Sequence, residues 1–396
     1  MRHTLICTLG TSLFYPNLRN LPTADRYDSW LVRQPEGDRP ALTASLVQAL
    51  KTAFDAADWD ALALHLTDLP VHTRLCGAEI NSISDLLHRG YCTPDARLVL
   101  CHSDTDEGGA IATLLRHYYE LRGHTVECKC IKGLQDQNPK VFRTTGLRNL
   151  VKAMSQAVLA GGAPHCAINA TGGYKAQIAI GVLLGQALQI PVYYKHERFS
   201  EIIAFPPMPI SLDFDLWLAN TGWLMALDRD PDKHLPYTDL EADWTESLEP
   251  LVERIQKDGV EYITLSPTGE IFHTAFKDRY CSTQDQLLPP PALAGEKRSP
   301  KLTDHSWGNA RPKIQRHLQR LTDDSPYVRQ CRTHYWNPSL STFNGFRLKG
   351  EQIEGIFSNG SWTVKFYVDT TSTTPGQRNA CIYDLNRQLS ELDGKR

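Results

Sequence analysis

The predicted fold follows from one stretch of ten residues, Ile168-Asn169-Ala170-Thr171-Gly172-Gly173-Tyr174-Lys175-Ala176-Gln177. Apolar runs at 165–168 and 178–184 flank them, in the order of a buried parallel strand, a glycine turn and a buried helix. Gly172 and Gly173 allow the backbone to turn tightly and to approach a ligand closely. The predicted helix begins with free N–H groups and a positive dipole end, and Lys175 lies in its first turn. Such a turn favours a phosphate group, although the pattern also fits a plain tight connection in an α/β sheet.

Strands and helices alternate along the first half of the chain. Short apolar runs predict strands at 4–9, 97–101, 126–131, 165–169 and 192–195, and helical spacing predicts helices at 41–58, 110–121, 147–159 and 178–184, with another opening at 78–83. This alternation predicts an α/β fold, a parallel sheet with helices on both faces. Nothing matches the G-x-G-x-x-G pattern with a downstream acid, which disfavours a dinucleotide fold of the NAD type.

Polar residues follow three of the predicted strands. Because parallel strands end at the same edge of a sheet, we expect these residues to form a rim there that suits a small polyphosphate or nucleotide. The candidate ligand-binding residues are Gly10, Thr11, Ser12, Ser103, Asp104, Thr105, Asn169, Thr171, Gly172, Gly173, Tyr174 and Lys175.

Composition limits the class of protein. The 396 residues are 41% apolar, enough for two or three domains with real cores. The ten cysteines are scattered without a C-x-x-C pair, so we expect no zinc or other metal site. Residues 1–9 are too short for a signal peptide and no apolar run reaches the length of a membrane span, so a soluble cytoplasmic protein is expected.

Charge is distributed unevenly along the chain. The net charge is −3, so the charge of the whole chain gives no reason to expect that it binds nucleic acid. Residues 297–396, however, hold 16 Lys or Arg against 9 Asp or Glu, a net of +7 that leaves −10 for the first 296 residues. A basic C-terminal part indicates a polyanionic partner, and a solvated basic face explains the charge equally well.

Four segments of the first 212 residues together resemble the CARF domains of type III CRISPR-associated proteins. They are Leu9-Gly10-Thr11-Ser12, Ala78-Glu79-Ile80-Asn81-Ser82, Ser103-Asp104-Thr105-Asp106-Glu107-Gly108 and Asn169-Ala170-Thr171-Gly172-Gly173-Tyr174-Lys175. The resemblance implies a Rossmann-like domain and a homodimer that binds a cyclic oligoadenylate, most often tetra-adenylate, across its two-fold axis. It also implies that the segment 10–12 lines one side of the pocket and the segment 169–175 the other. Some family members cut the ring slowly with a Ser and a Lys at positions like Ser12 and Lys175, and whether this chain does so is open.

The pattern changes after residue 212. A winged helix-turn-helix is predicted over residues 213–283. Its helices are expected at 213–227 and 244–256, the second after a capping box at 238–241. Its hairpin is expected to consist of 260–265, a turn at 266–269 and 270–276. We expect a connector or a dimerisation unit, since an acidic face opposes a DNA duplex; its acidic residues are Glu246, Glu249, Glu253, Asp258 and Glu261. Residues 284–303, with three consecutive prolines at 289–291, are predicted to be a linker.

Residues 304–396 predict a small α+β domain. A basic amphipathic helix at 312–321 precedes a strand at 345–349, a hairpin of 352–357 and 362–368 around an Asn-Gly turn, a strand at 380–383 and a tail helix at 385–392. With Leu348-Lys349-Gly350 ahead of the hairpin, these ninety or so residues resemble the RelE family of ribosome-dependent mRNA interferases. The chain departs from that family at 353–356, where some members carry lysines.

The RelE resemblance implies that the partners are the ribosome and mRNA. In that family the 2′-OH attacks the adjacent phosphate, helped by basic residues that orient it and stabilise the developing charge. A plain exposed side chain on a half-buried strand is an equally good interpretation of each candidate. The candidate catalytic residues are Arg332, His334, Arg347, Lys349, Lys365, Tyr367, Arg378 and Tyr383.

Two other functions fit parts of the sequence. CARF domains are often fused to HEPN ribonucleases, whose motif is Arg, four to six residues, then His, and Arg311 to His317 and Arg329 to His334 both match it. HEPN domains are helical, whereas 346–383 predicts strands, so the RelE-like ribonuclease is favoured. The other alternative is a ligand-responsive transcription regulator, which the acidic residues of 213–283 disfavour. The favoured prediction is a cyclic oligoadenylate-activated mRNA interferase.

Overall fold

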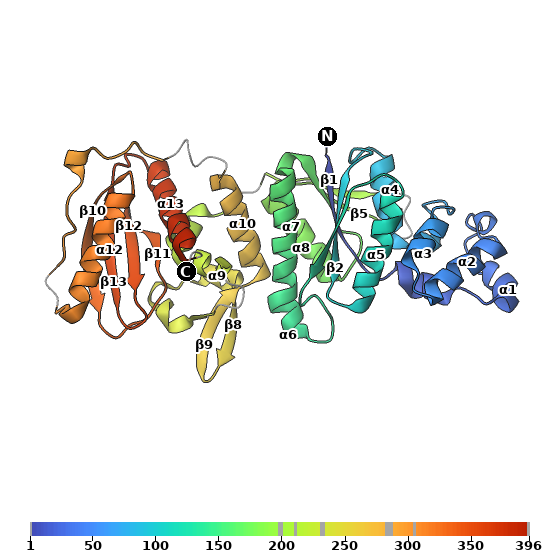
Figure 1. Ribbon diagram of the computed structural model, residues 1–396, viewed down its shortest axis with the longest axis horizontal. Coiled ribbons are helices and arrows are strands. Elements are labelled where there is room, and N and C mark those ends of the chain that lie inside the picture. The colour runs from blue at the N-terminus through green and yellow to red at the C-terminus, as the bar shows by residue number, and fades with distance from the viewer. Residues whose placement is uncertain are drawn as a thin grey trace. The chain divides into compact units, whose positions relative to one another are not determined.

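A computed structural model describes residues 2–196, 201–209, 212–229, 234–281, 288–303 and 306–393 (Figure 1). The chain forms two compact units, residues 1–210 and 211–396. Parts of the predicted linker, residues 284–287, and the start of the predicted C-terminal domain, residues 304–305, lie outside the described residues.

The first unit is built on a six-stranded sheet with the order β3-β2-β1-β4-β5-β6. The five predicted strands are present and parallel, and β1 at its centre is buried along its whole length. A sixth strand, which the sequence analysis missed, pairs antiparallel at the edge. The strands are β1 (Thr4–Thr8), β2 (Arg97–Ser103), β3 (Val126–Ile131), β4 (Cys166–Asn169), β5 (Val192–Tyr194) and β6 (Ile203–Phe205).

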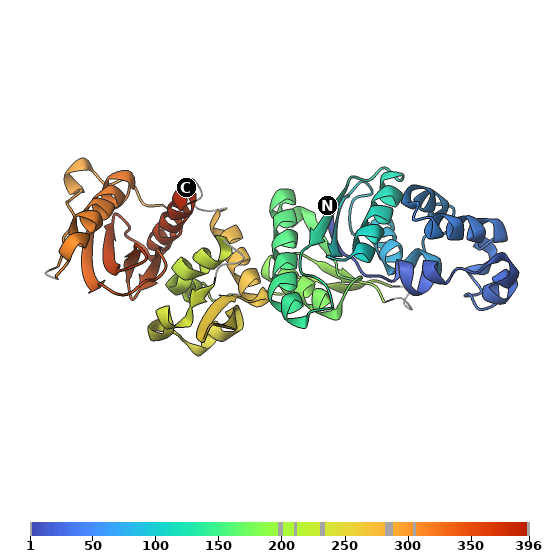
Figure 2. The ribbon, with the colours of Figure 1, turned by 60° about the horizontal axis from the view of Figure 1, so that its bottom comes forward.

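Helices cover both faces of this sheet, as the alternation predicted (Figures 1 and 2). On one face lie α4 (Gly77–His88) and α5 (Asp106–Glu120), and on the other α7 (Leu147–Gly161) and α8 (Lys175–Ala187). The predicted helix at 41–58 is α2 (Ala44–Asp55), and α1 (Tyr27–Leu31), α3 (Trp59–Leu66) and the short α6 (Pro139–Val141) were not predicted. The mixed α/β fold with a mainly parallel sheet is therefore confirmed.

The second unit contains a four-stranded antiparallel sheet with the order β10-β13-β12-β11. Its strands are β10 (Val328–Asn337), β11 (Gly345–Lys349), β12 (Gln352–Ser358) and β13 (Thr363–Thr370), flanked by α12 (Arg311–Asp324) and α13 (Pro375–Asp393). The predicted helix, the strand at 345–349 and the hairpin are confirmed, and β10 was missed. The apolar side chains of β13 alternate onto one face, where Phe366 packs with Ile314 and Leu318 of α12.

The rest of this unit differs from its predicted elements. Residues 213–227 do form a helix, α9 (Phe214–Arg229), but the hairpin joins β8 (Val252–Lys257) to β9 (Val260–Leu265), with a short β7 (Leu235–Pro236) beside it. The helix predicted at 244–256 is wrong, because Pro250 confines helical structure to a 3-10 turn at Glu246–Leu251. The turn of the hairpin is Asp258-Gly259, both at positive φ, which is the dipeptide that two-residue hairpins favour.

Two predicted strands are helical for one shared reason. Residues 270–276 belong to α10 (Pro267–Cys281), and residues 380–383 belong to α13. Each helix starts with a hydroxyl residue followed by proline: Ser266 Oγ accepts from Gly269 N at 3.0 Å, and Thr374 Oγ1 accepts from Gln377 N at 3.2 Å. An N-cap hydroxyl before a proline is a helix start signal, which the sequence analysis treated as a turn or overlooked.

The segments 213–283 and 304–396 share one hydrophobic core. Trp217 of α9 stacks on Phe276 of α10 with ring centroids 3.4 Å apart, and both belong to a buried cluster that includes Ile356 and Tyr383. The described part of the predicted linker also packs on the sheet, where Lys301 bridges Arg332 in parallel. The second unit is therefore a single packed body.

Candidate functional site

The loops after β1 and β4 touch at the carboxyl edge of the sheet. The two strands pair in parallel with Cys7 opposite Asn169, so both end at the same edge. A Cβ added to Gly172 would lie 2.7 Å from the nitrogen of Gly10 and 2.7 Å from the carbonyl oxygen of Thr8. Thr8 Oγ1 donates to the carbonyl oxygen of Gly172 at 2.6 Å. Only glycine at 172 permits this approach, which brings the two predicted walls of the ligand site together.

A buried carboxylate on α4 fastens the first loop. Glu79, 2% exposed, accepts from Gly10 N at 3.1 Å and from Ser12 Oγ at 2.6 Å. From the same helix, Ser82 Oγ accepts from Asn169 Nδ2 at 2.8 Å and so holds the second loop. Neither Glu79 nor Ser82 was a predicted site residue, although both lie in the 78–82 segment that carries the CARF resemblance.

The second loop is ordered by its own side chains. Thr171 Oγ1 donates to Asn169 Oδ1 at 2.6 Å and accepts from the backbone nitrogen of Lys195 at 3.0 Å. Tyr174 is half-buried, and Lys175 is exposed at the first position of α8. The backbone N–H groups and a lysine are therefore placed at a helix N-terminus, as the sequence predicted.

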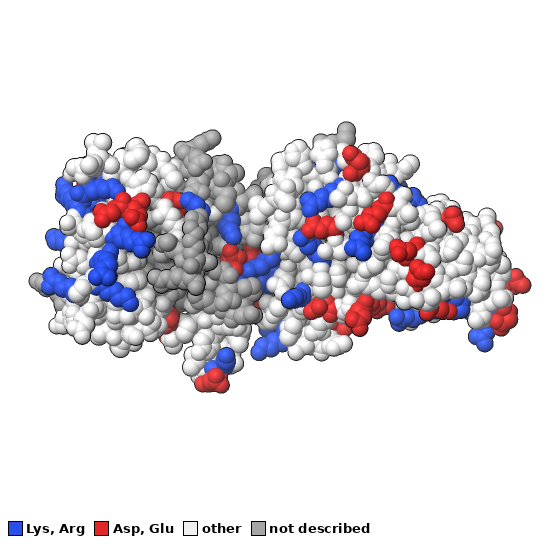
Figure 3. Space-filling model, viewed as in Figure 1, with Lys and Arg blue, Asp and Glu red and all other residues white. Residues whose placement is uncertain are grey.

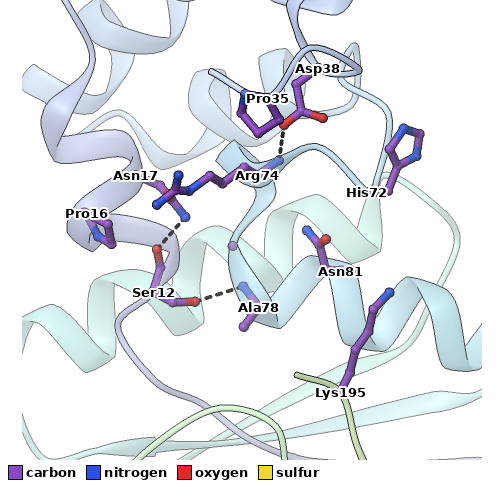
Figure 4. A pocket seen from close by; sticks show the side chains of 11 residues that line it. Ser12, Pro16, Asn17, Pro35, Asp38, His72, Arg74, Ala78, Asn81 and Lys195 are labelled. Carbon is purple, nitrogen blue, oxygen red and sulfur yellow. Dashed lines mark hydrogen bonds between the residues drawn. The ribbon is translucent and has the colours of Figure 1, made fainter. Parts of the chain in front are cut away.

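A cavity of about 390 Å³ lies beside this edge, within the size range of small-molecule sites (Figure 4). Of the predicted ligand-binding residues, Ser12 lines it. The other lining residues are Pro16, Asn17, Pro35, Asp38, His72, Arg74, Gly77, Ala78, Asn81 and Lys195. Figure 4 shows that they come from several segments: the loop after β1, the connection between α1 and α2, the connection before α4, α4 itself and the residue after β5.

Two cations at this cavity were missed by the sequence analysis. Lys195 Nζ lies 2.8 Å from Asp85 Oδ2, and Asp38 Oδ2 accepts from the backbone nitrogen of Arg74 at 2.8 Å. Burial opposes ionisation of Asp85, but hydrogen bonds from Lys195 and Arg89 lower the pKa of its carboxyl overall. The carboxyl-edge rule applied to the predicted strand 192–195 would have selected Lys195. Arg74 carries no motif, because it comes from an irregular connection.

The third predicted segment lies at a different hollow. Asp104 and Thr105 line a cavity of about 460 Å³ together with Trp59, His102 and Cys130. Thr105 Oγ1 caps α5 by accepting from Gly108 N at 3.0 Å, and Ser103 Oγ lies 2.8 Å from Thr105 Oγ1. These hydroxyls therefore hold the start of a helix, and the structure does not bring them to the cavity of Ser12.

In the second unit, the face of the four-stranded sheet opposite α12 gathers most of the predicted catalytic residues. A row of register partners crosses the strands in the order Arg347, Glu354, Tyr367 and Arg332. We call this surface the basic face; it consists of Arg332, His334, Arg347, Lys349, Lys365 and Tyr367 around Glu354.

Glu354 is the centre of the basic face and was not predicted. Its side chain is fully buried, with Oε2 2.7 Å from Arg347 Nε and Oε1 3.1 Å from Lys349 Nζ and 2.9 Å from His334 Nε2. Burial opposes ionisation of Glu354, but Arg347 and Lys349 lower the pKa of its carboxyl below the ordinary value. The position is the one at which the sequence departs from the RelE pattern. A carboxylate here pairs with two basic groups of the neighbouring strand β11 and lies beside a third, His334, at a bulge in β10.

The remaining groups of the basic face have altered basicity. The rings of His334 and Tyr367 stack with centroids 4.2 Å apart, and burial lowers the pKa of His334. Burial and the charge of Arg347 lower the pKa of Lys365, whose Nζ lies 5.1 Å from the ring centre of Tyr335. A lysine of lowered pKa and an imidazole are both side chains that can give and take protons.

Three predicted catalytic residues have other partners. Arg332 forms a bidentate pair with Asp369 at 2.9 and 3.0 Å. Arg378 lies on α13 and donates to the carbonyl oxygen of Glu351 at 2.9 Å. Tyr383 is 3% exposed in the hydrophobic core, because the predicted strand that carried it is a helix. The structure thus places Tyr383 away from the basic face.

The opposite side of this sheet carries separate basic side chains. Arg311, Lys313, Arg316 and Arg320 are exposed along α12, and Figure 3 shows Lys and Arg side chains gathered over that helix with some acidic ones beside them. His317 of α12 is instead stacked on Phe357, with ring centroids 3.7 Å apart.

The described residues contain neither a membrane-spanning helix nor a cluster of metal ligands. In that part of the chain no helix has both the length and the apolar character needed to cross a membrane. Nor do three His, Cys, Asp or Glu side chains gather there as metal ligands would.

Comparison with known proteins points to one family for part of the chain. A solved structure of Can2 from Sulfobacillus thermosulfidooxidans in complex with cyclic tetra-adenylate aligns with a TM-score of 0.23 and 12% identity, over 69% of this chain and 74% of that one. None of the curated proteins matches. Residues 74–208, which include α4, β2 to β5 and the turn 169–175, are similar to the family described as CRISPR-associated protein (Cas_APE2256).

Proposed function

We propose that this chain is a CRISPR-associated effector that binds a cyclic oligoadenylate in its first unit and cleaves RNA in its second. The observation that carries the proposal is the coincidence of the family match with the built site. The matched residues 74–208 hold Glu79, Asn81, Lys195 and the turn 169–175, which surround the carboxyl edge and its cavity. A polar cavity with cations at the carboxyl edge of a parallel sheet suits an anionic nucleotide.

Cyclic tetra-adenylate is the proposed activator. The N–H groups at the start of α8, Lys175 and the cavity cations Lys195 and Arg74 supply donors for phosphate, and Ser12 and Asn81 supply donors and acceptors for base and ribose. In a homodimer two such edges would share one ring. The solved Can2 structure contains cyclic tetra-adenylate, which makes this ring the first ligand to test.

The basic face is the proposed site of RNA cleavage. Lys365 or His334 takes the proton of the 2′-OH, the 2′ oxygen bonds to the adjacent phosphorus, and the 5′ oxygen leaves with a proton from the other group. The products are a 2′,3′-cyclic phosphate and a 5′-OH. Arg347 and Lys349 stabilise the charge on the phosphate oxygens, and Tyr367 packs under His334.

We propose that mRNA in the ribosome is the substrate. Support comes from the α+β architecture of residues 306–393 and from the basic face itself. For the HEPN alternative, Arg329 and His334 would have to lie on a helix, whereas both are on β10. His317, the other HEPN candidate, is packed against Phe357.

One experiment separates these functions. Purified protein is incubated with labelled mRNA with or without cyclic tetra-adenylate, once with ribosomes and once without. The proposal predicts cleavage only when both the activator and ribosomes are present. Equal cleavage of naked RNA would remove the ribosome requirement, and cleavage that is independent of the ring would remove the sensing role. Ligand-dependent binding to a defined promoter, without cleavage, would instead establish a regulator.

A further inference from the structure

One acidic side chain reaches the basic face from outside the sheet. Asp243 ends a 3-10 turn at Glu241–Asp243, in the connection between β7 and β8. Its Oδ2 lies 2.7 Å from Arg347 Nη1, so Arg347 is held between Glu354 of its own sheet and Asp243 of another segment. The side chain of Asp243 is 45% exposed and that of Arg347 is 7% exposed.

Without the carboxylate of Asp243, the cations around this contact outnumber the anions. Arg347, Lys349 and Lys365 supply three cations, and the buried carboxylate of Glu354 balances one of them. Burial opposes ionisation of Asp243, but Arg347, Lys365 and Lys349 lower the pKa of its carboxyl below the ordinary value. Asp243 is therefore an anion that this cluster binds.

The guanidinium of Arg347 also retains an unused donor. Its Nη2 is buried and has no hydrogen-bond partner among the residues that the structure describes. Buried donors are nearly always paired, and guanidinium groups pair two donors with the two oxygens of a phosphate. Nη2 is inaccessible in the present arrangement, so a phosphate can reach it only after neighbouring groups move.

We propose that Arg347, Lys349 and Lys365 form a binding site for an RNA phosphate diester, and that the carboxylate of Asp243 occupies this site when no RNA is bound. The inference rests on the proposed RNA cleavage and specifies which groups hold the phosphate and what must leave first. Because Asp243 comes from the segment between the sensing unit and the sheet in sequence, release of this one contact couples RNA binding to movement of that segment.

The test compares Asp243→Asn and Asp243→Ala with wild type and with Glu241→Gln. Asn has the shape of Asp without its charge, and Glu241 is an exposed carboxylate two residues away that provides the same charge change. The full-length proteins bind a fluorescent single-stranded RNA whose 2′-O-methyl groups prevent cleavage, and the anisotropy is measured at low and at moderate salt. We expect both Asp243 variants to bind about tenfold more tightly than wild type and the Glu241 variant to bind as wild type does.

Unchanged or weaker binding by both Asp243 variants, with melting temperatures near that of wild type, would overturn the inference. A gain shared by the Glu241 variant would also overturn it, because the effect would then be one of net charge. Cleavage by wild type under cyclic tetra-adenylate is assayed in parallel. If wild type cleaves RNA but the Asp243 variants gain no affinity, the proposed function is supported and the proposal that Asp243 occupies the phosphate site is refuted. If the variants gain affinity and wild type never cleaves, the phosphate site stands without the proposed activity.

Discussion

The carboxyl edge of the first unit and the basic face of the second are both organised by a buried glutamate, but with different donors. Glu79 accepts from a backbone N–H and a hydroxyl, both neutral, whereas Glu354 lies against Arg347, Lys349 and His334. Neutral donors keep their geometry over a wide range of pH and salt. An ionic cluster depends on the charge of every member, so removal of one charged side chain lowers the stability of the fold more strongly.

The largest effect on stability is expected when the central carboxylate of the basic face is removed. Glu354→Ala removes the buried carboxylate that lies against Arg347 and Lys349 and leaves the partly exposed Asp243 beside Arg347, and we expect the free energy of unfolding to fall by about 3–5 kcal/mol. Urea denaturation followed by tryptophan fluorescence measures it, since six of the eight tryptophans lie in residues 211–396. Glu351→Ala, an exposed acid on the same hairpin, is the control and should change little. Equal effects of the two variants would mean that Glu354 does not hold the cluster.

The second unit should also be sensitive to acid through His317. Burial on α12 lowers the pKa of His317 to about 4, against 6.5 for an ordinary histidine. The unfolded chain therefore binds the proton more readily, and the stabilising contribution is complete above pH 6.5 and lost as the pH falls towards 4. The loss amounts to about 3 kcal/mol at most.

His317→Phe isolates this contribution, because Phe keeps the stack on Phe357 without a titratable group. The difference in unfolding free energy between wild type and variant should change between pH 7 and pH 4 and stay constant above pH 7. A difference that is independent of pH would show that His317 is protonated as easily in the folded state as in the unfolded one.

At the carboxyl edge, the close approach of two loops can be broken with one methyl group. Gly172→Ala places a Cβ 2.7 Å from backbone atoms of Gly10 and Thr8, and we expect a loss of about 1–3 kcal/mol of stability together with weaker binding of cyclic tetra-adenylate. Gly37→Ala is the matched control, because a Cβ there meets nothing within 4 Å. Thermal melting and titration calorimetry report the two effects. Normal ligand binding by Gly172→Ala would separate this turn from the ligand site.

The smallest effect is expected for a single exposed cation at that edge. Lys175→Ala should weaken binding of cyclic tetra-adenylate about tenfold, since one lysine near a helix N-terminus contributes about 1–1.5 kcal/mol to holding a phosphate. Lys140→Ala, which removes another exposed lysine from the same unit, should leave affinity unchanged. Equal affinities of Lys175→Ala and wild type would remove Lys175 from the ligand site.

The sequence predicted the first unit far better than the second for a physical reason. The strand–turn–helix order around Gly172 is local, and the central strands β1, β2 and β4 each contain a short apolar run that can be recognised without knowledge of its partner strand. In the second unit, Ser266-Pro267 and Thr374-Pro375 begin helices, although the residues after them had been predicted as strands. A short apolar stretch can form either a strand or a buried helix, and in these two segments the N-cap hydroxyl followed by proline starts a helix.

Sequence alone specifies the parallel sheet through its short apolar runs, and it specifies the turn at 172–173 and the hairpin around Asn359-Gly360 through Gly173 and Gly360, whose positive φ values glycine adopts readily. Only the tertiary structure decided which side chains meet. Lys195 and Arg74 reach the cavity from segments far apart in the chain. Strand register places Glu354 opposite Arg347, and Asp243 contacts Arg347 across 104 residues. Such contacts depend on long-range pairing and packing, which local pattern does not encode.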